Sequence, residues 1–428
     1  MTAAVLFGSF VLFLILNLPV GIALGLASMC AIISSGVSNI GYVAQGLVTA
    51  TDSFPLMAVP FFILAGDLMG KGGISRRLLD LGYMFFGKYT GGLGIVTVAA
   101  CMFFAAISGS GPATVAAIGG IMIPAMYERG YSKPFSTGLV AAAGSIGVII
   151  PPSIPFVVYG VTSGVSISSL FLGGLIPGIM IGLALMGWTY YSARKKGYVG
   201  DGKEHTLQDK LKALNEAKWA LFVPILILGG IYGGIFTPTE AAAVAVIYGF
   251  VVGVFVYKDL KWADLYEVVS SSALTTATVM IIIGTATAFG RILTLEQIPI
   301  ALAEAMTAFT QSPIVILLLI NILLIFVGTF METLAAIIIL APILVPVIKT
   351  VGIDPLHFGV VMVANLAIGF ITPPLGVNLF VACGIGNAKL EEVSKGAMPF
   401  MFVMIAVLML ITYIPELSTY LPKLLSGK

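Results

Sequence analysis

Long apolar runs separated by short polar segments repeat along the whole chain. They lie near residues 4–33, 54–70, 92–107, 112–126, 135–165, 169–192, 218–236, 239–257, 268–290, 313–330, 332–348, 357–385 and 397–415. A helix that crosses a bilayer needs about 20 such residues. The runs lack the alternation of apolar and polar residues that is typical of a membrane β-barrel. The pattern predicts an all-α polytopic membrane protein, because backbone groups in lipid must be paired within their own segment.

The composition agrees with this class. Of the 428 residues, 59% are hydrophobic and only 9% are charged, whereas soluble domains carry about 25% charged residues. The net charge of +2 gives no reason to expect a nucleic-acid partner. Cys30, Cys101 and Cys383 lie inside apolar runs, as small buried hydrophobes do. His205 and His357 are too few and too isolated for a metal site.

The ends and loops of the runs indicate an orientation. The first run has no basic segment or cleavage site before it, so we expect a retained first helix rather than a signal peptide. Residues 192–218 form the only long polar stretch and carry seven of the 21 Lys and Arg residues. By the positive-inside rule this linker is predicted to be cytoplasmic. Basic clusters at 71–88, 129–133, 258–261 and 389–395 are predicted on the same side.

Two segments are predicted to enter and leave the membrane on one side. Between the basic clusters 71–88 and 129–133, Ser-Gly-Ser-Gly-Pro at 108–112 interrupts the apolar run. Each flank has about 15 residues, which is short for a full crossing. The segment 313–349 has the same form, with its tip at residues 328–333. Both are predicted to be re-entrant helical hairpins.

The two hairpins belong to an internal repeat. Residues 109–118 and 328–337 share the pattern Gly-Ser/Thr-x-x-x-Thr-x-Ala-Ala-Ile, and residues 146–152 and 368–374 share Ile-Gly-x-x-x-Pro-Pro. The order of hairpin and then Gly/Pro-interrupted helix is the same in both halves. The five crossings predicted between the hairpins place them on opposite faces. The sequence therefore predicts inverted repeats with two hairpins and two broken helices.

The Pro-Pro pairs favour a binding site. They remove amide donors and end a helix, and Gly147 and Gly369 make local unwinding easy. Non-helical backbone at membrane depth persists only when it is buried in protein or lines a hydrated cavity. Free carbonyls there suit a small cation, and half-helix N-termini suit an anionic group. With no Cys or His nearby, oxygen ligands favour Na⁺. The alternative is that these prolines only kink ordinary spanning helices.

With these motifs in view, the chain resembles the large membrane (M) subunit of TRAP, the tripartite ATP-independent periplasmic transporters. The resemblance covers essentially the whole chain and is carried by residues 108–114, 147–153, 236–241 and 371–378. It implies an elevator-type secondary transporter, similar to the ion-transporter superfamily, in a bacterial inner membrane. It also implies Na⁺ coupling, a small four-helix Q membrane subunit as a separate chain, and a periplasmic substrate-binding protein. Substrates would be organic acids of the C4-dicarboxylate or sialic acid type.

Carried over by position, the resemblance implies two Na⁺ sites and a substrate site. The first ion site would use Ser108, Ser110, Gly147 and Pro151, and the second Gly328, Thr329, Gly369, Thr372 and Pro373. Substrate contacts would come from Ser110, Thr114, Ser153, Arg291, Glu332 and Asn378. Thr372 matches Ile150 and Asn378 matches Phe156 in the other half. The second site is therefore expected to be the better liganded.

Two charged residues have alternative interpretations. Arg291 either pairs with a substrate carboxylate or the binding protein, or extends to the membrane interface as long basic side chains do. Glu332, at the second tip, is a cation ligand, a substrate contact, a gate or an exposed tip residue.

Other polar residues are expected to be structural. Glu240 follows Thr239, which is predicted to cap a helix. Asn17, Asn321 and Asn365 are expected to bridge helices through hydrogen bonds.

The predicted organisation alternates scaffold and transport parts. Residues 1–90 form N-terminal scaffold helices and an arm, 91–165 the first transport half, and 166–290 scaffold helices with the linker 192–218. Residues 291–312 form a second arm, 313–396 the second transport half, and 397–428 a C-terminal helix.

The function predicted from these features is Na⁺-coupled symport of a carboxylate, bound between the hairpins. No nucleophile–base set or phosphate loop is present in the sequence, so neither an enzyme nor an organic cofactor is expected. The alternatives are a stand-alone Na⁺/dicarboxylate or divalent-anion symporter, an ion channel and an intramembrane enzyme.

Overall fold

A computed structural model describes residues 2–36, 39–200 and 206–426, and these ranges contain helices and no strand. Lys203 and His205, in the predicted linker 192–218, lie outside the described residues. Within the described ranges, seven helical segments are long and apolar enough to cross a membrane. They are Phe54–Lys71, Ile167–Lys196, Leu207–Tyr232, Pro238–Val256, Trp262–Leu295, Thr333–Thr350 and Leu390–Tyr413. The prediction of an all-α polytopic membrane protein is confirmed.

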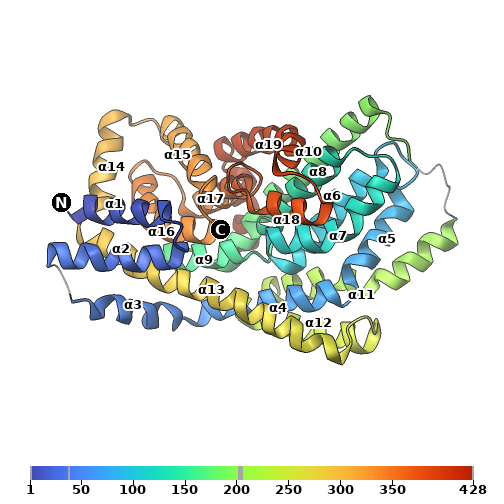
Figure 1. Cartoon of the computed structure of the whole chain (residues 1–428), viewed down its shortest axis with the longest axis horizontal. Helices are drawn as coiled ribbons and strands as arrows, with labels where there is room; N and C mark the ends of the chain where they lie inside the picture. Colours follow the sequence, from blue (N-terminus) through green and yellow to red (C-terminus); the bar gives the residue numbers. More distant parts are fainter. Residues whose placement is uncertain (1, 37–38, 201–205, 427–428) are drawn as a thin grey trace.

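The first apolar run, residues 4–33, forms two helices. Helix α1 (Thr2–Ile15) packs against α2 (Val20–Ser35), as Figure 1 shows. Asn17 adopts a left-handed φ of 64° between them, and Pro19 immediately precedes α2. Asn tolerates this conformation and Pro cannot continue a helix. Asn17 therefore makes a turn, and its predicted role as a bridge between helices was wrong.

The rest of the first half continues through short and long helices. After α3 (Gly41–Thr51) come the 3₁₀ turn η1 (Phe54–Met57), α4 (Ala58–Lys71) and α5 (Ile74–Phe86). The predicted first hairpin corresponds to α6 (Gly92–Ser108) and α7 (Gly111–Glu128). The following helix is interrupted: α8 (Lys133–Gly144) leads into the 3₁₀ turn η2 (Ser145–Val148), and α9 (Ile154–Ser163) resumes after the prolines.

Long helices join the two halves. They are α10 (Ile167–Lys196), α11 (Leu207–Tyr232), α12 (Pro238–Val251) with its π-helical end η3 (Val252–Val256), and α13 (Trp262–Leu295). In Figure 1, α13 runs along the lower side of the molecule, where it contacts α2, α3, α4 and α16. Its 34 residues span about 50 Å, more than a bilayer core about 30 Å thick.

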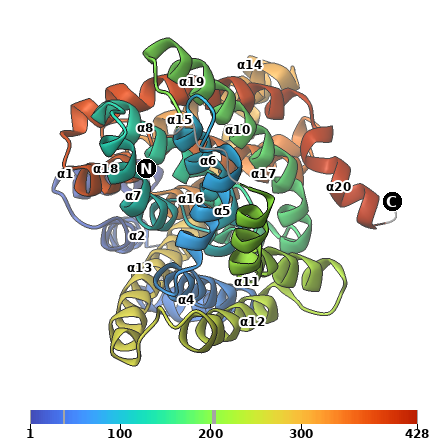
Figure 2. The ribbon, with the colours of Figure 1, turned by 90° about the vertical axis from the view of Figure 1, so that its right-hand side faces the viewer.

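The second half repeats the order of hairpin and interrupted helix. After α14 (Ile298–Phe309), α15 (Pro313–Gly328) and α16 (Thr333–Thr350) form the second helical pair. The interrupted pair is α17 (Pro355–Gly369) and α18 (Val377–Gly386), followed by α19 (Leu390–Tyr413) and α20 (Glu416–Ser426). Figure 2 shows α20 projecting at one edge of the molecule.

Some of the predicted boundaries between scaffold and transport parts fall between helices, and others fall inside a helix. Those at 90/91, 165/166 and 312/313 lie between helices. Those at 290/291 and 396/397 lie inside α13 and α19, which continue without a break.

Buried polar side chains join the C-terminal helices. Asn365 Nδ2 donates to Asn321 Oδ1 at 2.8 Å, and Asn321 Nδ2 donates to Thr412 Oγ1 at 3.0 Å. The His357 ring nitrogens lie 2.7 Å from Ser418 Oγ and 3.1 Å from the Thr412 carbonyl oxygen. The predicted bridging roles of Asn321 and Asn365 are confirmed.

The start of α12 confirms a structural role for Glu240 and corrects the residue that caps it. Thr237 accepts the Glu240 N–H, and the Glu240 carboxylate accepts the Thr237 N–H at 2.8 Å, which is a capping box. Thr239, the predicted cap, lies in the first turn and donates to the Phe54 carbonyl. Pro238 favours the first helical position, so the cap moves to the residue before it.

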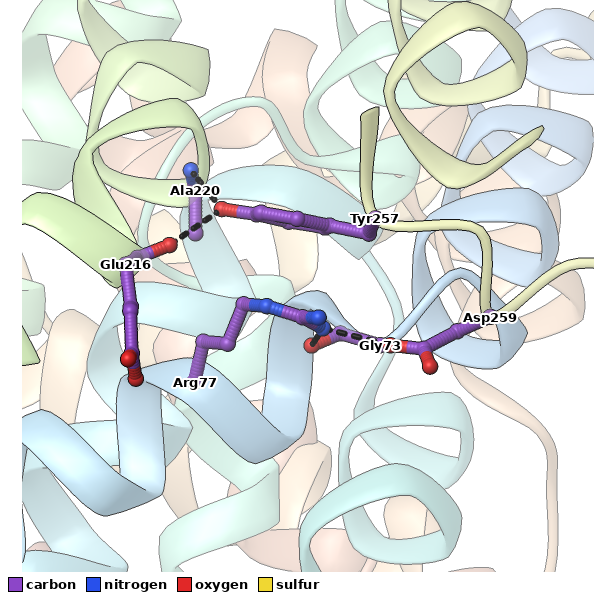
Figure 3. Close-up of polar contacts among 6 residues, drawn as sticks. All are labelled: Gly73, Arg77, Glu216, Ala220, Tyr257 and Asp259. Carbon is purple, nitrogen blue, oxygen red and sulfur yellow. Dashed lines mark hydrogen bonds and ion pairs between the residues drawn. The ribbon is translucent and has the colours of Figure 1, made fainter. Parts of the chain in front are cut away.

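An ion pair that lies over an aromatic ring holds three helical segments together (Figure 3). The Arg77 guanidinium pairs with Asp259 and lies 3.7 Å from the centre of the Tyr257 ring. The Tyr257 hydroxyl donates to the Glu216 carbonyl at 2.9 Å and accepts from the Ala220 N–H. These contacts connect α5, α11 and the turn between α12 and α13.

Candidate functional site

The tip of the first hairpin contacts the interrupted helix that follows it. Gly109 ends α6 with a φ of 62°, and Ser110 caps α7. The Ile154 N–H, at the start of α9, donates to the Gly109 carbonyl at 3.3 Å. The tip therefore lies against the residues that follow the first Pro-Pro pair.

Four of the predicted residues form an oxygen-rich cluster there. Thr114 Oγ1 lies 3.1 Å from Ser108 Oγ and donates to the Ser110 carbonyl at 2.7 Å. A Cβ atom on Gly147 would lie 2.5 Å from the Ser110 carbonyl oxygen and 2.6 Å from Thr114 Oγ1. Only glycine permits this approach. Pro151 lies in the same interruption of the helix.

The second hairpin makes the corresponding contact. A Cβ on Gly369 would lie 2.6 Å from the Gly328 carbonyl oxygen, so α15 and α17 meet backbone to backbone. The Leu375 N–H, inside the second interruption, donates to the Thr329 carbonyl at 3.1 Å. The structure thus brings Gly328, Thr329 and Gly369 together.

The two threonines of this second group follow the ends of α15 and α17, and each donates to a carbonyl in the last turn of the helix before it. Thr329 Oγ1 donates to the Phe326 carbonyl at 2.7 Å, and Thr372 Oγ1 to the Ile368 carbonyl at 2.8 Å. A hydroxyl that donates keeps its oxygen lone pairs, so both side chains retain an oxygen for a cation. Pro373 follows Thr372 in the interruption.

A cavity of about 370 Å³ lies between the two hairpin tips. Residues at the N-terminal ends of four helices line it: Gly111 of α7, Ile154 of α9, Leu334 of α16 and Val377 of α18. Ser110 is a further lining residue. Helix N-termini carry partial positive charge and are established anion-binding positions.

Glu332 gives this cavity its only charged side chain among the described lining residues. Its carboxylate accepts the N–H groups of Leu334 at 3.0 Å and Ala335 at 3.3 Å, which caps α16. The side chain is partly buried rather than a free tip residue. The cavity is therefore positive at three helix ends and carries a counter-charge at the fourth.

Arg291 lies in a second cavity of about 530 Å³. Its Nη2 donates to Thr49 Oγ1 at 3.2 Å, and its guanidinium carbon lies 5.8 Å from the centre of the Tyr42 ring. Arg291 and Glu332 line different cavities. Both cavities are lined by α9, α13 and α16, so they follow one another along these three helices.

Two further predicted substrate residues do not line either cavity. Ser153 Oγ donates to the Val148 carbonyl at 2.6 Å and caps α9, so it spans the first interruption. Asn378 Nδ2 donates to Ser145 Oγ at 3.1 Å and to the Ala141 carbonyl at 3.1 Å, which connects the second half to the first. Its buried Oδ1 atom has no partner among the described residues.

Comparison with known proteins identifies the family. The family model "Tripartite ATP-independent periplasmic transporter, DctM component" matches residues 7–417. The isethionate TRAP transporter permease DctMQ of Oleidesulfovibrio alaskensis is 55% identical over 97% of this chain and 66% of its own length. The C4-dicarboxylate large permease DctM of Vibrio cholerae is 41% identical over 100% of this chain and 99% of its own length.

This chain belongs to the DctM family of TRAP transporter large permeases. The sialic acid large permease SiaM of Vibrio cholerae is also similar to it, with 40% identity over 96% of each chain. A solved structure, the YdaH transporter of Alcanivorax borkumensis, matches 87% of this chain and 88% of its own with a TM-score of 0.60. At 16% identity that likeness shows the fold alone.

Helix α13 contributes lining residues to the permease cavity that were not predicted. Thr275 and Thr278 line the cavity between the tips, three positions apart on one face of the helix. The signal was present in the sequence, because residues 270–278 place six hydroxyl side chains inside an apolar run.

Proposed function

We propose that this permease is the membrane subunit of a Na⁺-coupled symporter that imports an organic acid anion by an elevator movement. The observation that carries this proposal is the cavity between the two hairpin tips, where four helix N-termini converge. An anion is favoured there without a basic side chain, because the partial positive charges of the three helix ends that have no counter-charge add.

The two contacts between a tip and an interruption are the proposed Na⁺ sites. At the first, Ser108, Ser110 and Gly147 supply hydroxyl and carbonyl oxygens. At the second, Gly328, Thr329, Gly369 and Thr372 do so, with the Pro151 and Pro373 regions beside them. Hard oxygen ligands suit an alkali cation, and ions at both sites would add positive charge on either side of the substrate.

The cavity favours an organic acid with one strong anionic group. Its described lining has one carboxylate and no Lys or Arg, which opposes a second negative charge on the substrate. Hydroxyl groups on Ser110, Thr275 and Thr278 offer hydrogen bonds to a polar substrate. Isethionate and sialic acid, named for two relatives, fit this description. A C4-dicarboxylate is the competing substrate, supported by the DctM relatives.

The second cavity is proposed as the entrance. Arg291 there would attract an organic anion, and the shared helices α9, α13 and α16 lead toward the tips. Because the entrance and the binding cavity lie on one path, Arg291 can act on the substrate without contacting it in the bound state.

The proposed partners are a small Q membrane subunit and a periplasmic binding protein. The family description names a tripartite transporter, and the DctMQ relative, of which this chain spans about two thirds, supports a Q partner. The proposed location is a bacterial inner membrane with the linker 192–218 in the cytoplasm. In this arrangement the hairpins are re-entrant and the halves are inverted.

Transport in reconstituted vesicles tests the proposal. The permease, a Q subunit and a binding protein are placed in liposomes, and uptake of labelled isethionate, sialic acid and succinate is measured. We expect uptake of at least one substrate, chemically unchanged, only with an inward Na⁺ gradient. Conductance without coupling would indicate a channel, and uptake without the binding protein would indicate a stand-alone symporter.

Two alanine variants test the ion sites in the same vesicles. Ser108→Ala and Thr329→Ala each remove one proposed oxygen ligand, so the Na⁺ concentration for half-maximal uptake should rise on the order of tenfold. The controls Thr97→Ala and Thr350→Ala remove hydroxyls that donate within their own helices. Unchanged Na⁺ dependence in both site variants would exclude these sites.

A further inference from the structure

A cavity distant from the hairpin tips collects positive charge. It has a volume of about 540 Å³ and lies between the start of α8, the end of α10 and the start of α19. Lys195 and Lys196 of α10 and Lys395 of α19 line it. The three helices are neighbours at the upper right of Figure 1. The charge therefore comes from two helices far apart in the sequence.

No acidic side chain lines this cavity among the described residues, and none of its three lysines forms an ion pair with a described residue. Glu392, near Lys395 on α19, instead accepts the Lys389 N–H and caps the helix. The polar cavity beside Arg77 is different. Asp80 and Glu216 there offset the basic residues.

The wall of the cavity is apolar and aromatic. Trp188 and Tyr191, whose rings lie 5.4 Å apart, line it from α10, and Phe400 lines it from α19. The Lys196 ammonium lies 5.0 Å from the centre of the Phe135 ring. Trp and Tyr concentrate where membrane headgroups begin. The cavity thus has lysines beside an apolar wall, and its Trp and Tyr residues are of the kind found at the membrane–water interface.

We propose that this cavity binds the headgroup of an anionic phospholipid. The lysines would pair with the lipid phosphate, and an acyl chain would lie on the aromatic wall. Basic pockets between membrane helices bind such headgroups because the charge is matched and the chain stays in the bilayer. A soluble phosphate would match the lysines but leave the apolar wall without a partner.

Fluorescence quenching of Trp188 tests this proposal directly. The variant W219F/W262F leaves Trp188 as the only tryptophan. It is reconstituted in phosphatidylethanolamine vesicles that contain brominated phosphatidylglycerol or, for comparison, brominated phosphatidylethanolamine. We expect phosphatidylglycerol to quench at a mole fraction on the order of tenfold lower. Equal quenching by the two lipids would by itself overturn the proposal.

Lysine variants then assign the preference to this cavity. In the same background, K195Q/K196Q/K395Q should abolish the preference for phosphatidylglycerol. The control K212Q/K258Q/K261Q replaces three lysines that do not line the cavity and should leave the preference for phosphatidylglycerol unchanged. The proposed site would be contradicted if the preference survived in K195Q/K196Q/K395Q. It would also be contradicted if inorganic phosphate displaced the lipid. The readout requires no transport, so its result is independent of the proposed symport.

Discussion

Glu332 has two roles that a single substitution can separate. Its carboxylate caps α16 and also faces the cavity between the tips. Glutamine keeps an oxygen for the Leu334 and Ala335 N–H groups but removes the negative charge.

We expect Glu332→Gln to lower the KM for the organic anion on the order of tenfold, because a repulsive charge leaves the cavity. Uptake at graded substrate concentrations measures this. Glu332→Ala should instead lower stability by about 1 kcal/mol through loss of the cap. The control Glu240→Gln changes a capping box outside both cavities. A higher KM for Glu332→Gln would mean that the carboxylate itself holds the substrate.

Asp80 carries a pH effect on stability. Burial raises the pKa of its carboxyl above the ordinary 3.8; Arg76 lowers it, Glu216 raises it and Arg77 lowers it. A raised pKa in the folded state means that stability falls as pH rises from the ordinary value through the raised one. The penalty is fully present above the raised pKa.

Asp80→Asn should therefore raise the thermal stability at about pH 8 and leave it unchanged at about pH 2.5, where the carboxyl is largely protonated in both states. The gain should stay below about 1 kcal/mol, because neighbouring groups desolvate the carboxyl only in part and the residue remains exposed to solvent, which screens its charge. Thermal unfolding of both proteins across this pH range measures it, with the exposed Asp52→Asn as control. An equal gain at both pH values would show that ionisation is not its cause.

At the scale of elements, the contact between a hairpin tip and an interrupted helix is the repeated unit. It depends on Gly147 in the first half and on Gly369 in the second, where a Cβ would meet a carbonyl oxygen.

Gly147→Ala should abolish Na⁺-driven uptake and lower stability by about 1–3 kcal/mol, because the new methyl separates α7 from η2. Gly120→Ala, on the open face of α7, is the matched control and should leave both unchanged or raise stability slightly. Uptake in vesicles and thermal unfolding measure the two effects. Normal uptake by Gly147→Ala would show that this close approach is not needed.

These elements were predictable to different degrees. The hairpins and interruptions follow from Gly and Pro positions inside apolar runs, which act through local backbone chemistry. The break at Asn17 was missed because the hydrophobic run continues through it. The hydrogen bonds of Ser153 and Asn378 depend on which segments pack together, which local sequence does not specify. The same holds for the separation of Arg291 from the tips.

At the scale of the whole molecule, α13 lies between the parts that the elevator proposal assigns to scaffold and transport. It packs on α2, α3 and α4 on the scaffold side and on α16 on the transport side. Residues from α13 line both cavities. Movement of the transport parts would therefore slide α16 along α13, whereas α3 and α13 would stay together.

Crosslinking distinguishes these two interfaces. A Cβ on Gly290 of α13 would lie 3.9 Å from Pro342 Cγ of α16, and a Cβ on Gly46 of α3 would lie 3.2 Å from the Ala288 Cβ of α13. In a background with Cys30, Cys101 and Cys383 replaced by alanine, G290C/P342C should lose uptake when a short thiol crosslinker is added. The loss should not occur when the crosslinker joins G46C/A288C, because both of those helices belong to the scaffold. Equal uptake by both crosslinked variants would mean that α13 and α16 do not move past one another during transport, and the elevator assignment of these helices would be wrong.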